Sequence, residues 1–465
     1  MPAPPDIYQN EVDFTALALR YPDFAKKLKA NRQLDFSDPE SVRQLTKALL
    51  HRDFDLTISL PEDRLCPPVR SRAYRNKLEA DINARFNYVL FVQRLLDSTQ
   101  DNYNDAYDPN RKVIGIDIGT GASAIYPLLA CRQRPPWLFL ATEIDARSKE
   151  FAERNVKDNG LASRIKVIGP GSESNAIIPV AELERFERID ILLTNPPFYT
   201  SETELQALAK QKARPPNSAC TGAPVEMICP GGEVSFVSQI VDESTLPANK
   251  TKIQWFSSML GKLGSVTVII DKLKETGCTN YAVTEFVQGQ RTRRWCVAWS
   301  WLGLRPVQAV ARGTDAVEKK HLPFPTEMKV LVDADVGATT RKLNEEFTKL
   351  DGMEWRWRSG LQAGIGRSMN GDVWSRHARR RQKRREVENH DSMDVETAKH
   401  DNNHKEEELP EPNFAFKIMV QPQNAEMMTD VADPTTTVLK LRWLQGQDST
   451  LFESFHGWLK RKLTQ

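Results

Sequence analysis

Asn195, Pro196, Pro197 and Phe198 have the groups needed to hold a planar amine. They follow an apolar run at 189–193, which predicts that they stand at the carboxyl end of a strand. An exocyclic or amide nitrogen is a poor nucleophile because its lone pair is delocalised. The Asn195 oxygen and the Pro196 carbonyl can accept its two N–H bonds, while Phe198 stacks on a base. A rigid turn is the plain alternative, because Asn-Pro pairs are common in turns.

A second group of residues can hold a cofactor. Asp117, Gly119, Gly121 and Ser123 come at the end of the predicted strand 113–118. Glycines there let the backbone turn tightly and pass close to a ligand. The third glycine of a dinucleotide fingerprint is missing, since position 124 is Ala124. The Asp-x-Gly-x-Gly loop of S-adenosylmethionine enzymes fits better than that fingerprint, and an ordinary strand-to-helix turn is the alternative.

Glu143 follows the next predicted strand, at 138–142. In nucleoside-binding α/β sheets an acid at this place accepts hydrogen bonds from both ribose hydroxyls. Asp145 competes for the role, but it is better placed to cap the predicted helix 146–159. Glu143 is therefore the candidate ribose ligand.

The predicted elements that position these residues alternate in type. Residues 1–100 read as helical: Phe14, Leu17 and Leu19 share a face, a helix follows the Ser37–Glu40 start signal, and 85–96 is the clearest helix. Short apolar runs then alternate with helices such as 146–159 and 232–242, which predicts an α/β fold with a mostly parallel sheet covered on both faces. The predicted strands are 113–118, 138–142, 165–168, 189–194, 266–270 and 281–287, with 295–301 as an antiparallel edge.

The predicted domains are a helical extension at 1–100, a catalytic domain at 101–302, a linker at 303–326 and an α+β module at 327–465. In the module, strands are predicted at 328–332, 353–358, 414–420 and 437–443, and helices at 339–350 and 450–463. The segment 366–412 is low in apolar residues and is predicted to be a disordered, charged insertion.

Together these motifs resemble the family of RNA adenine-N6 methyltransferases that modify U6 small nuclear RNA (the methyltransferase-like protein sixteen type), related to bacterial enzymes acting on large-subunit ribosomal RNA. The resemblance runs from about Asp13 to Trp301. Its landmarks are Tyr21–Phe24, Arg64–Pro67, Arg85–Tyr88, Gly115–Ser123, Ile125–Pro127, Ala141–Glu143, Asn195–Phe198, Gly231–Glu233 and Thr284–Phe286.

The resemblance implies a Rossmann-like, seven-stranded class I methyltransferase fold with an N-terminal helical extension. It implies that Gly119, Ser123 and Glu143 contact S-adenosylmethionine, and that Arg85 grips the carboxylate of that cofactor. Asn195 and Phe198 would hold the target adenine. The 327–465 module resembles the kinase-associated-like domain that this family uses to hold structured RNA; a domain that binds a protein partner is the alternative.

The sequence departs from the family pattern in three places. Residues 1–19 contain no Lys or Arg, although the family has a basic arm there. The loop 169–174 has no lysine, so a basic residue that gates the cofactor pocket is not expected. The segment 288–295 has one residue more than the family pattern, so its arginines do not align clearly with those of the family.

Three basic groups are candidate RNA contacts, each with a solvated loop or face as the alternative. The run 376–385 can also serve nuclear import. The candidate residues are Lys210, Lys212, Arg214, Arg291, Arg293, Arg294, Arg379, Arg380 and Arg381.

Composition bounds the function. With 465 residues, 40% hydrophobic and 27% charged, the chain is not wholly disordered. The net charge of +2 hides two adjacent blocks, of +7 at 375–385 and −8 at 386–411. The sequence shows no membrane span, secretion signal, metal-binding motif or disulfide framework. We therefore expect reduced cysteines, no association with a membrane and no bound metal. We expect the enzyme to be nuclear, possibly also cytoplasmic. The rivals are a protein glutamine methyltransferase and a non-catalytic RNA-binding protein; protein partners are not indicated.

Overall fold

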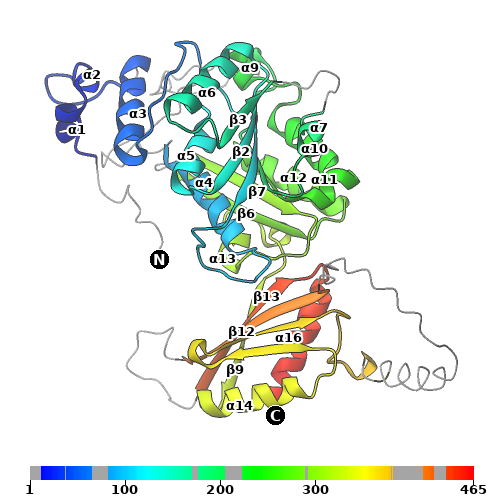
Figure 1. Cartoon of the computed structure of the whole chain (residues 1–465). Coiled ribbons are helices and arrows are strands. Elements are labelled where there is room, and N and C mark those ends of the chain that lie inside the picture. Colours follow the sequence, from blue (N-terminus) through cyan, green and yellow to red (C-terminus); the bar gives the residue numbers. More distant parts are fainter. Residues whose placement is uncertain are drawn as a thin grey trace, which may run out of the picture. The chain divides into compact units, whose positions relative to one another are not determined.

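The computed structural model describes residues 12–36, 38–64, 82–169, 176–204, 223–288, 292–378, 380, 412–423 and 436–464. These form two compact units (Figure 1). The first comprises residues 1–98, 104–302 and 309–323, and the second comprises 99–103, 303–308 and 324–465. No helix among the described residues is long and apolar enough to cross a membrane.

The first unit begins with helices, as predicted. Asp38 caps α3 by accepting hydrogen bonds from the N–H groups of Glu40 and Ser41. Leu19 is 85% exposed, so it does not share the buried face of Phe14 and Leu17. The bounds are α1 Phe14–Arg20, α2 Pro22–Ala25, α3 Pro39–Phe54 and α4 Ile82–Asp97.

The central sheet of this unit has the strand order β3-β2-β1-β4-β5-β7-β6-β8. The first five are parallel, and β7 runs antiparallel between β5 and β6, which confirms the mostly parallel sheet and the antiparallel pair; β5 itself is not among the predicted strands, and β8, not β7, forms the edge. The bounds are β1 Val113–Ile118, β2 Trp137–Thr142, β3 Ile165–Ile168, β4 Ile189–Thr194, β5 Ile253–Leu260, β6 Asn280–Gln288, β7 Thr292–Ser300 and β8 Arg312–Gly313.

Helices cover both faces of this sheet (Figure 1). On β5, Phe256 packs in the same core as Ile240 of α10 and Ile269 of α12. The next residue, Ser257, points the other way and hydrogen-bonds Tyr88 of α4. The helices of the layers are α5 Ile125–Gln133, α6 Ala146–Asp158, α7 Val180–Leu183, α9 Pro224–Met227, α10 Gly232–Ser244, α11 Pro247–Lys252 and α12 Leu263–Glu275.

Two further predictions are wrong in this unit. Residues 266–270 are helical within α12, not a strand. The predicted linker 303–326 contains α13 Gln308–Ala311, the strand β8 paired with β6, and a 3-10 turn at Lys319–His321. Val310 and Val317 of that segment are buried. The sequence of 303–326 resembles a linker because its helix, strand and turn are too short to show a hydrophobic periodicity.

The second unit contains a five-stranded antiparallel sheet, β10-β11-β12-β13-β9, against which the helices α14 and α16 pack. Phe347 of α14 and Phe455 of α16 pack with Phe416 and Leu439 of the sheet. The predicted disordered segment 366–412 begins too early, because β11 continues to Ser368 and Trp374 is buried. The bounds are β9 Glu327–Asp333, α14 Val336–Thr348, β10 Glu354–Arg358, β11 Ala363–Ser368, β12 Phe414–Pro422, β13 Thr436–Gln445 and α16 Ser449–Thr464.

Candidate active site

The register of the first sheet brings three sequence motifs to one edge. Ile118 at the end of β1 pairs with Thr142 at the end of β2 and with Thr194 at the end of β4. The residues that follow these three are Gly119, Glu143 and Asn195. Since the strands are parallel, the glycine loop (residues 119–123), the acid and the loop predicted to be catalytic (residues 195–200, hereafter the catalytic loop) leave the sheet side by side at its carboxyl edge, where ligands of such sheets bind.

The glycine loop is held by the end of β2. The N–H of Gly119 donates to Thr142 Oγ1 at 3.2 Å, and the N–H of Thr120 donates to the Thr142 carbonyl at 2.9 Å. Gly119 and Gly121 have φ values of +70° and +65°, in the region that favours glycine. Ser123, also a predicted cofactor residue, is buried behind this loop.

Glu143 lies against the glycine loop. Its Oε2 accepts a hydrogen bond from the N–H of Gly121 at 2.8 Å, and its Oε1 accepts one from the N–H of Asp145 at 2.9 Å. Burial raises the pKa of this carboxyl, while the two backbone hydrogen bonds oppose the rise. Each oxygen keeps a second lone pair for a ligand hydroxyl. Asp145 caps α6, as predicted, by accepting from the N–H of Ser148.

Asp117 is fully buried below the same loop. Its Oδ2 accepts a hydrogen bond from Thr120 Oγ1 at 2.6 Å, and its Oδ1 has no partner among the described residues. Burial raises the pKa of this carboxyl to about 7, the charge of Glu143 adds to the rise, and that of Arg85 opposes it. The Arg85 guanidinium carbon lies 5.9 Å from the centroid of the Tyr126 ring.

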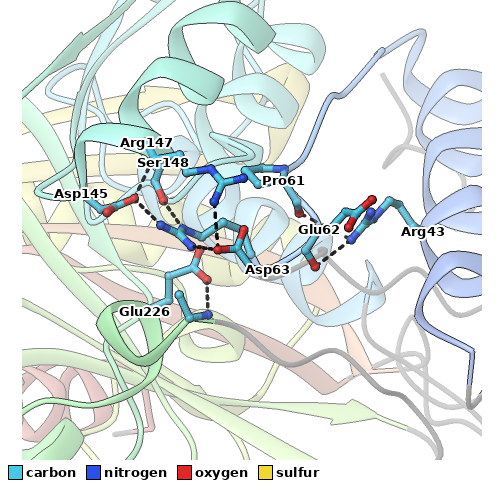
Figure 2. Close-up of polar contacts among 10 residues, drawn as sticks. Arg43, Pro61, Glu62, Asp63, Asp145, Arg147, Ser148 and Glu226 are labelled. Atoms are coloured by element: carbon cyan, nitrogen blue, oxygen red, sulfur yellow. Dashed lines mark hydrogen bonds and ion pairs between the residues drawn. The ribbon is translucent and has the colours of Figure 1, made fainter.

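Arg64 is a residue of this region to which sequence reasoning gave no role. Figure 2 labels its partners Asp63, Asp145 and Ser148. Its guanidinium donates to Asp145 Oδ1 at 2.9 Å, Ser148 Oγ at 3.0 Å and Asp63 Oδ2 at 2.7 Å. Its presence in an Arg-Leu-Cys-Pro landmark was the one signal available. The network fastens the segment before α4 to the N-terminus of α6, directly beside Glu143.

Glu226 of α9 is a second such residue (Figure 2). Its Oε2 accepts a hydrogen bond from the N–H of Ala223 at 3.1 Å. Its Oε1 lies 3.8 Å from where a Cβ on Gly121 would stand. Another carboxylate therefore faces the glycine loop, and its charge raises the pKa of Glu143. A lone glutamate after a long loop carries no pattern that sequence reasoning could use.

The catalytic loop begins from a fixed point on β4. The N–H of Thr194 donates to the Tyr88 hydroxyl at 3.3 Å, and Thr194 Oγ1 donates to the Ile118 carbonyl at 2.9 Å. Asn195 follows, and its Oδ1 is buried without a hydrogen-bond partner among the described residues. A buried amide oxygen without a partner costs about 1–3 kcal/mol. This acceptor is available to a donor that the chain itself does not supply.

The aromatic end of the loop is framed by basic and backbone groups. The Arg294 guanidinium carbon lies 5.3 Å from the centroid of the Phe198 ring. The N–H of Tyr199 donates to the Met227 carbonyl, and the N–H of Cys229 donates to the Tyr199 carbonyl, both at 3.0 Å. The catalytic loop and the helix that carries Glu226 are therefore joined.

The predicted RNA contacts are placed only in part. Arg294 lies beside Phe198, while Arg293 pairs with Glu285 at 3.5 Å. Arg380 is exposed in the second unit. Six of the predicted contacts lie outside the described residues: Lys210, Lys212, Arg214, Arg291, Arg379 and Arg381.

No group of three or more His, Cys, Asp or Glu in the described part of the chain could hold a metal ion. Cys131, Cys229 and Cys296 are free thiols.

Comparison with known proteins shows the family to which this chain belongs. A family model described as RNA methyltransferase matches residues 3–303. The chain belongs to this family. It is 33% identical over 350 residues to the U6 small nuclear RNA (adenine-(43)-N(6))-methyltransferase of Schizosaccharomyces pombe, covering 75% of this chain and 83% of that protein. It is 38% identical over 319 residues to the RNA N(6)-adenosine-methyltransferase METTL16 of Homo sapiens, covering 67% of this chain and 52% of that protein.

A solved structure shares the fold. The catalytic domain of human METTL16 in complex with the MAT2A 3′UTR hairpin 1 matches with a TM-score of 0.53 and 33% identity, covering 70% of this chain and 98% of that one. The predicted family, class I fold and enzyme class are thereby confirmed. The chain spans about half the length of the human relative.

S-adenosylmethionine is the methyl donor of this enzyme. The residues present fit such a cationic, ribose-bearing group. Asp117 has a buried oxygen without a partner among the described residues, Glu143 lies at the loop with acceptor capacity left, and Gly119 and Gly121 present only backbone to a ligand. The individual cofactor contacts stay predictions; the residues are Arg85, Asp117, Gly119, Gly121, Ser123, Glu143 and Asn195.

Proposed function

We propose that this chain transfers a methyl group from S-adenosylmethionine to N6 of an adenine in structured RNA, and that U6 small nuclear RNA is a substrate. The observation that carries the proposal is the buried Oδ1 of Asn195, which lacks a partner among the described residues and belongs to the residue after β4, whose last residue pairs with the last residue of β1. The names of the yeast and human relatives support both the position N6 and the RNA substrate.

The chemistry follows from what the loop can hold. When bound, S-adenosylmethionine supplies a methyl group on a positively charged sulfur. Asn195 Oδ1 and the Pro196 carbonyl accept the two N–H bonds of the adenine amine, which draws its lone pair away from the ring. Phe198 stacks on the base after it leaves its strand. After transfer the nitrogen loses one proton to solvent, so no side chain has to act as a dedicated base.

The second unit has a surface that suits RNA. Strand pairing places seven basic residues, together with the acids Glu327, Asp333 and Glu354, on the sheet face opposite α14 and α16, since paired residues share a face. We call the six of these basic residues that are not buried the basic sheet face; they are Lys329, Arg356, Arg358, Arg367, Lys417 and Lys440. A positive surface attracts the phosphate backbone without reading sequence. We propose that it holds the structured part of the substrate.

We also propose that the protein acts in the nucleus. The U6 substrate in the names of the yeast and fly relatives and the basic run 376–385 support this. A fluorescent fusion of the full chain should concentrate in the nucleus, and replacing the basic residues of 376–385 should weaken that concentration. An equal distribution of both proteins would contradict the role of the run.

Labelled S-adenosylmethionine tests the proposed reaction. The purified chain is incubated with a U6 hairpin that has an unpaired adenine, or with protein extract. Label should enter the hairpin, and changing that adenine to guanine should prevent it. Label in protein glutamine but not in RNA would support the rival glutamine methyltransferase. RNA binding without transfer to either substrate would support a non-catalytic binding protein.

A further inference from the structure

The turn between β5 and α12 is fixed by a buried carboxylate. Glu233, in the first turn of α10, is 3% exposed. Its Oε2 accepts a hydrogen bond from the N–H of Gly261 at 2.6 Å, and its Oε1 accepts one from the N–H of Lys262 at 3.1 Å. One buried side chain therefore accepts from two consecutive backbone N–H groups, so both residues of the turn are held in place.

This turn is the support of the Phe198 ring. A Cβ on Gly261 would stand 3.0 Å from Cδ1 and 3.4 Å from Cε1 of Phe198, and 3.1 Å from Glu233 Oε2, distances tighter than most real Cβ contacts. The ring therefore lies against the glycine backbone, and a side chain at position 261 would have to push it away. The position of the ring is set by the turn, not by the catalytic loop alone.

The same turn also holds the far end of the catalytic loop. Lys262 Nζ lies 3.0 Å from Glu204 Oε1. Glu204 Oε2 accepts hydrogen bonds from the N–H of Thr200 at 2.7 Å and from its hydroxyl at 2.6 Å. These contacts lower the pKa of Glu204 to about 2, so this carboxylate stays charged at any assay pH. Two residues after Phe198, the chain is tied back to the turn that supports the ring.

We propose that the turn at Gly261 and Lys262 is a positioning clamp for the target base. It sets the plane of Phe198, and with it the distance of the stacked adenine from Asn195 Oδ1. Glu233 and Glu204 are positioning residues that act through the turn. The proposal rests on the proposed function, because it concerns how that reaction orients its substrate. Displacement of a reacting group by about 1 Å can cost about 100-fold in rate.

The first test compares Gly261→Ala with Gly264→Ala. Gly264 lies three residues on, and a Cβ there meets nothing within 4 Å, so it is a matched control. Gly261→Ala should lower kcat for hairpin methylation at least about tenfold while the Kd for S-adenosylmethionine changes less than about twofold. A hairpin with 2-aminopurine at the target position should show altered fluorescence with Gly261→Ala and wild-type fluorescence with Gly264→Ala.

Equal kcat and equal 2-aminopurine fluorescence for the two variants would overturn the clamp. The outcome is separable from failure of the proposed function, because that failure would leave the wild-type protein without hairpin methylation. A lower melting temperature for Gly261→Ala with unchanged kcat would also overturn the clamp, since it would show a purely structural role.

The second test addresses the Glu204 connection. Lys262 is more than half exposed, so its ion pair adds little to stability. Lys262→Met should lower kcat about threefold without changing the melting temperature, and Lys262→Arg should restore kcat. Lys272→Met is the control, since Lys272 lies on α12, the helix that begins directly after this turn, and pairs with Asp242 at 2.7 Å. Equal kcat for Lys262→Met and Lys272→Met would overturn this part of the proposal.

Discussion

Asn195 illustrates how a site can be selected for function at the expense of stability. Its buried oxygen lacks a partner among the described residues, which costs about 1–3 kcal/mol in the protein without substrate. Asn195→Ala removes that oxygen. We expect this variant to lose hairpin methylation while its melting temperature stays equal to or above that of the wild type, as measured by thermal unfolding. A destabilised variant that still methylates would contradict the role of this oxygen.

Asp117 predicts a pH dependence of stability. Its pKa is raised from the ordinary 3.8 to about 7, mainly by burial. The folded protein therefore holds a proton that the unfolded chain releases. This contribution to stability is complete below about pH 4 and is lost as the pH rises through about 7. Asp117→Asn should remove the loss between pH 5 and pH 8, as measured by denaturant unfolding. An unchanged pH profile in Asp117→Asn would contradict the assignment.

The same carboxyl predicts a pH dependence of cofactor binding. A cationic ligand favours the ionised carboxylate, so S-adenosylmethionine should bind more tightly at pH 8 than at pH 6. Glu143 and Arg85 also face this group, and their charges act in opposite directions on its pKa. Titration calorimetry at the two pH values is the measurement, and Asp117→Asn should bind equally at both. Tighter binding at pH 6 would contradict the predicted sign.

At the scale of elements, α4 fixes the end of β4 through one hydroxyl. Tyr88 bonds Ser257 Oγ at 2.8 Å and accepts from the N–H of Thr194. Tyr88→Phe should cost about 1 kcal/mol of unfolding free energy and also lower kcat, because the residue before Asn195 loses its anchor. Tyr281→Phe is the control, since its buried hydroxyl bonds the His321 carbonyl at 3.2 Å. Equal kcat in the two variants would contradict the anchor.

Local sequence predicted the elements of the site well, because β1, β2 and β4 are short apolar runs that end in glycine, acid or proline. It failed at β5 and α12. Ser257 interrupts the apolar run of β5, and its buried hydroxyl is satisfied by the Leu192 carbonyl of the neighbouring strand. In α12, Val266, Ile269 and Ile270 are buried while Val268 is exposed, which is helical spacing within a run that resembles a strand.

The missed strand β11 and the missed site residues have a shared cause. Gly364 and Gly366 read as a break, but the rings of Trp355 and Phe416 fill the space of their side chains. Glu226 and Glu233 become site residues through contacts with other segments of the chain. Such contacts leave no local periodicity, so one sequence cannot reveal them.

For the whole molecule, the net charge of +2 is a poor guide to partners. The basic sheet face predicts an electrostatic contribution to RNA binding from the second unit. Arg356→Gln with Arg358→Gln should weaken hairpin binding and reduce the slope of log K against log salt by about 2. Arg341→Gln is the control, on α14 at the other face of the sheet. An unchanged slope in the double variant would favour a protein-binding role for the unit.

The most direct measurement is nucleoside mass spectrometry of a U6 hairpin after incubation with the protein and S-adenosylmethionine. The wild-type chain should produce N6-methyladenosine at one unpaired adenine, and Asn195→Ala should produce none while it binds the hairpin as tightly as the wild type. Methylation at another atom of adenine, or equal N6-methyladenosine from Asn195→Ala, would contradict the account.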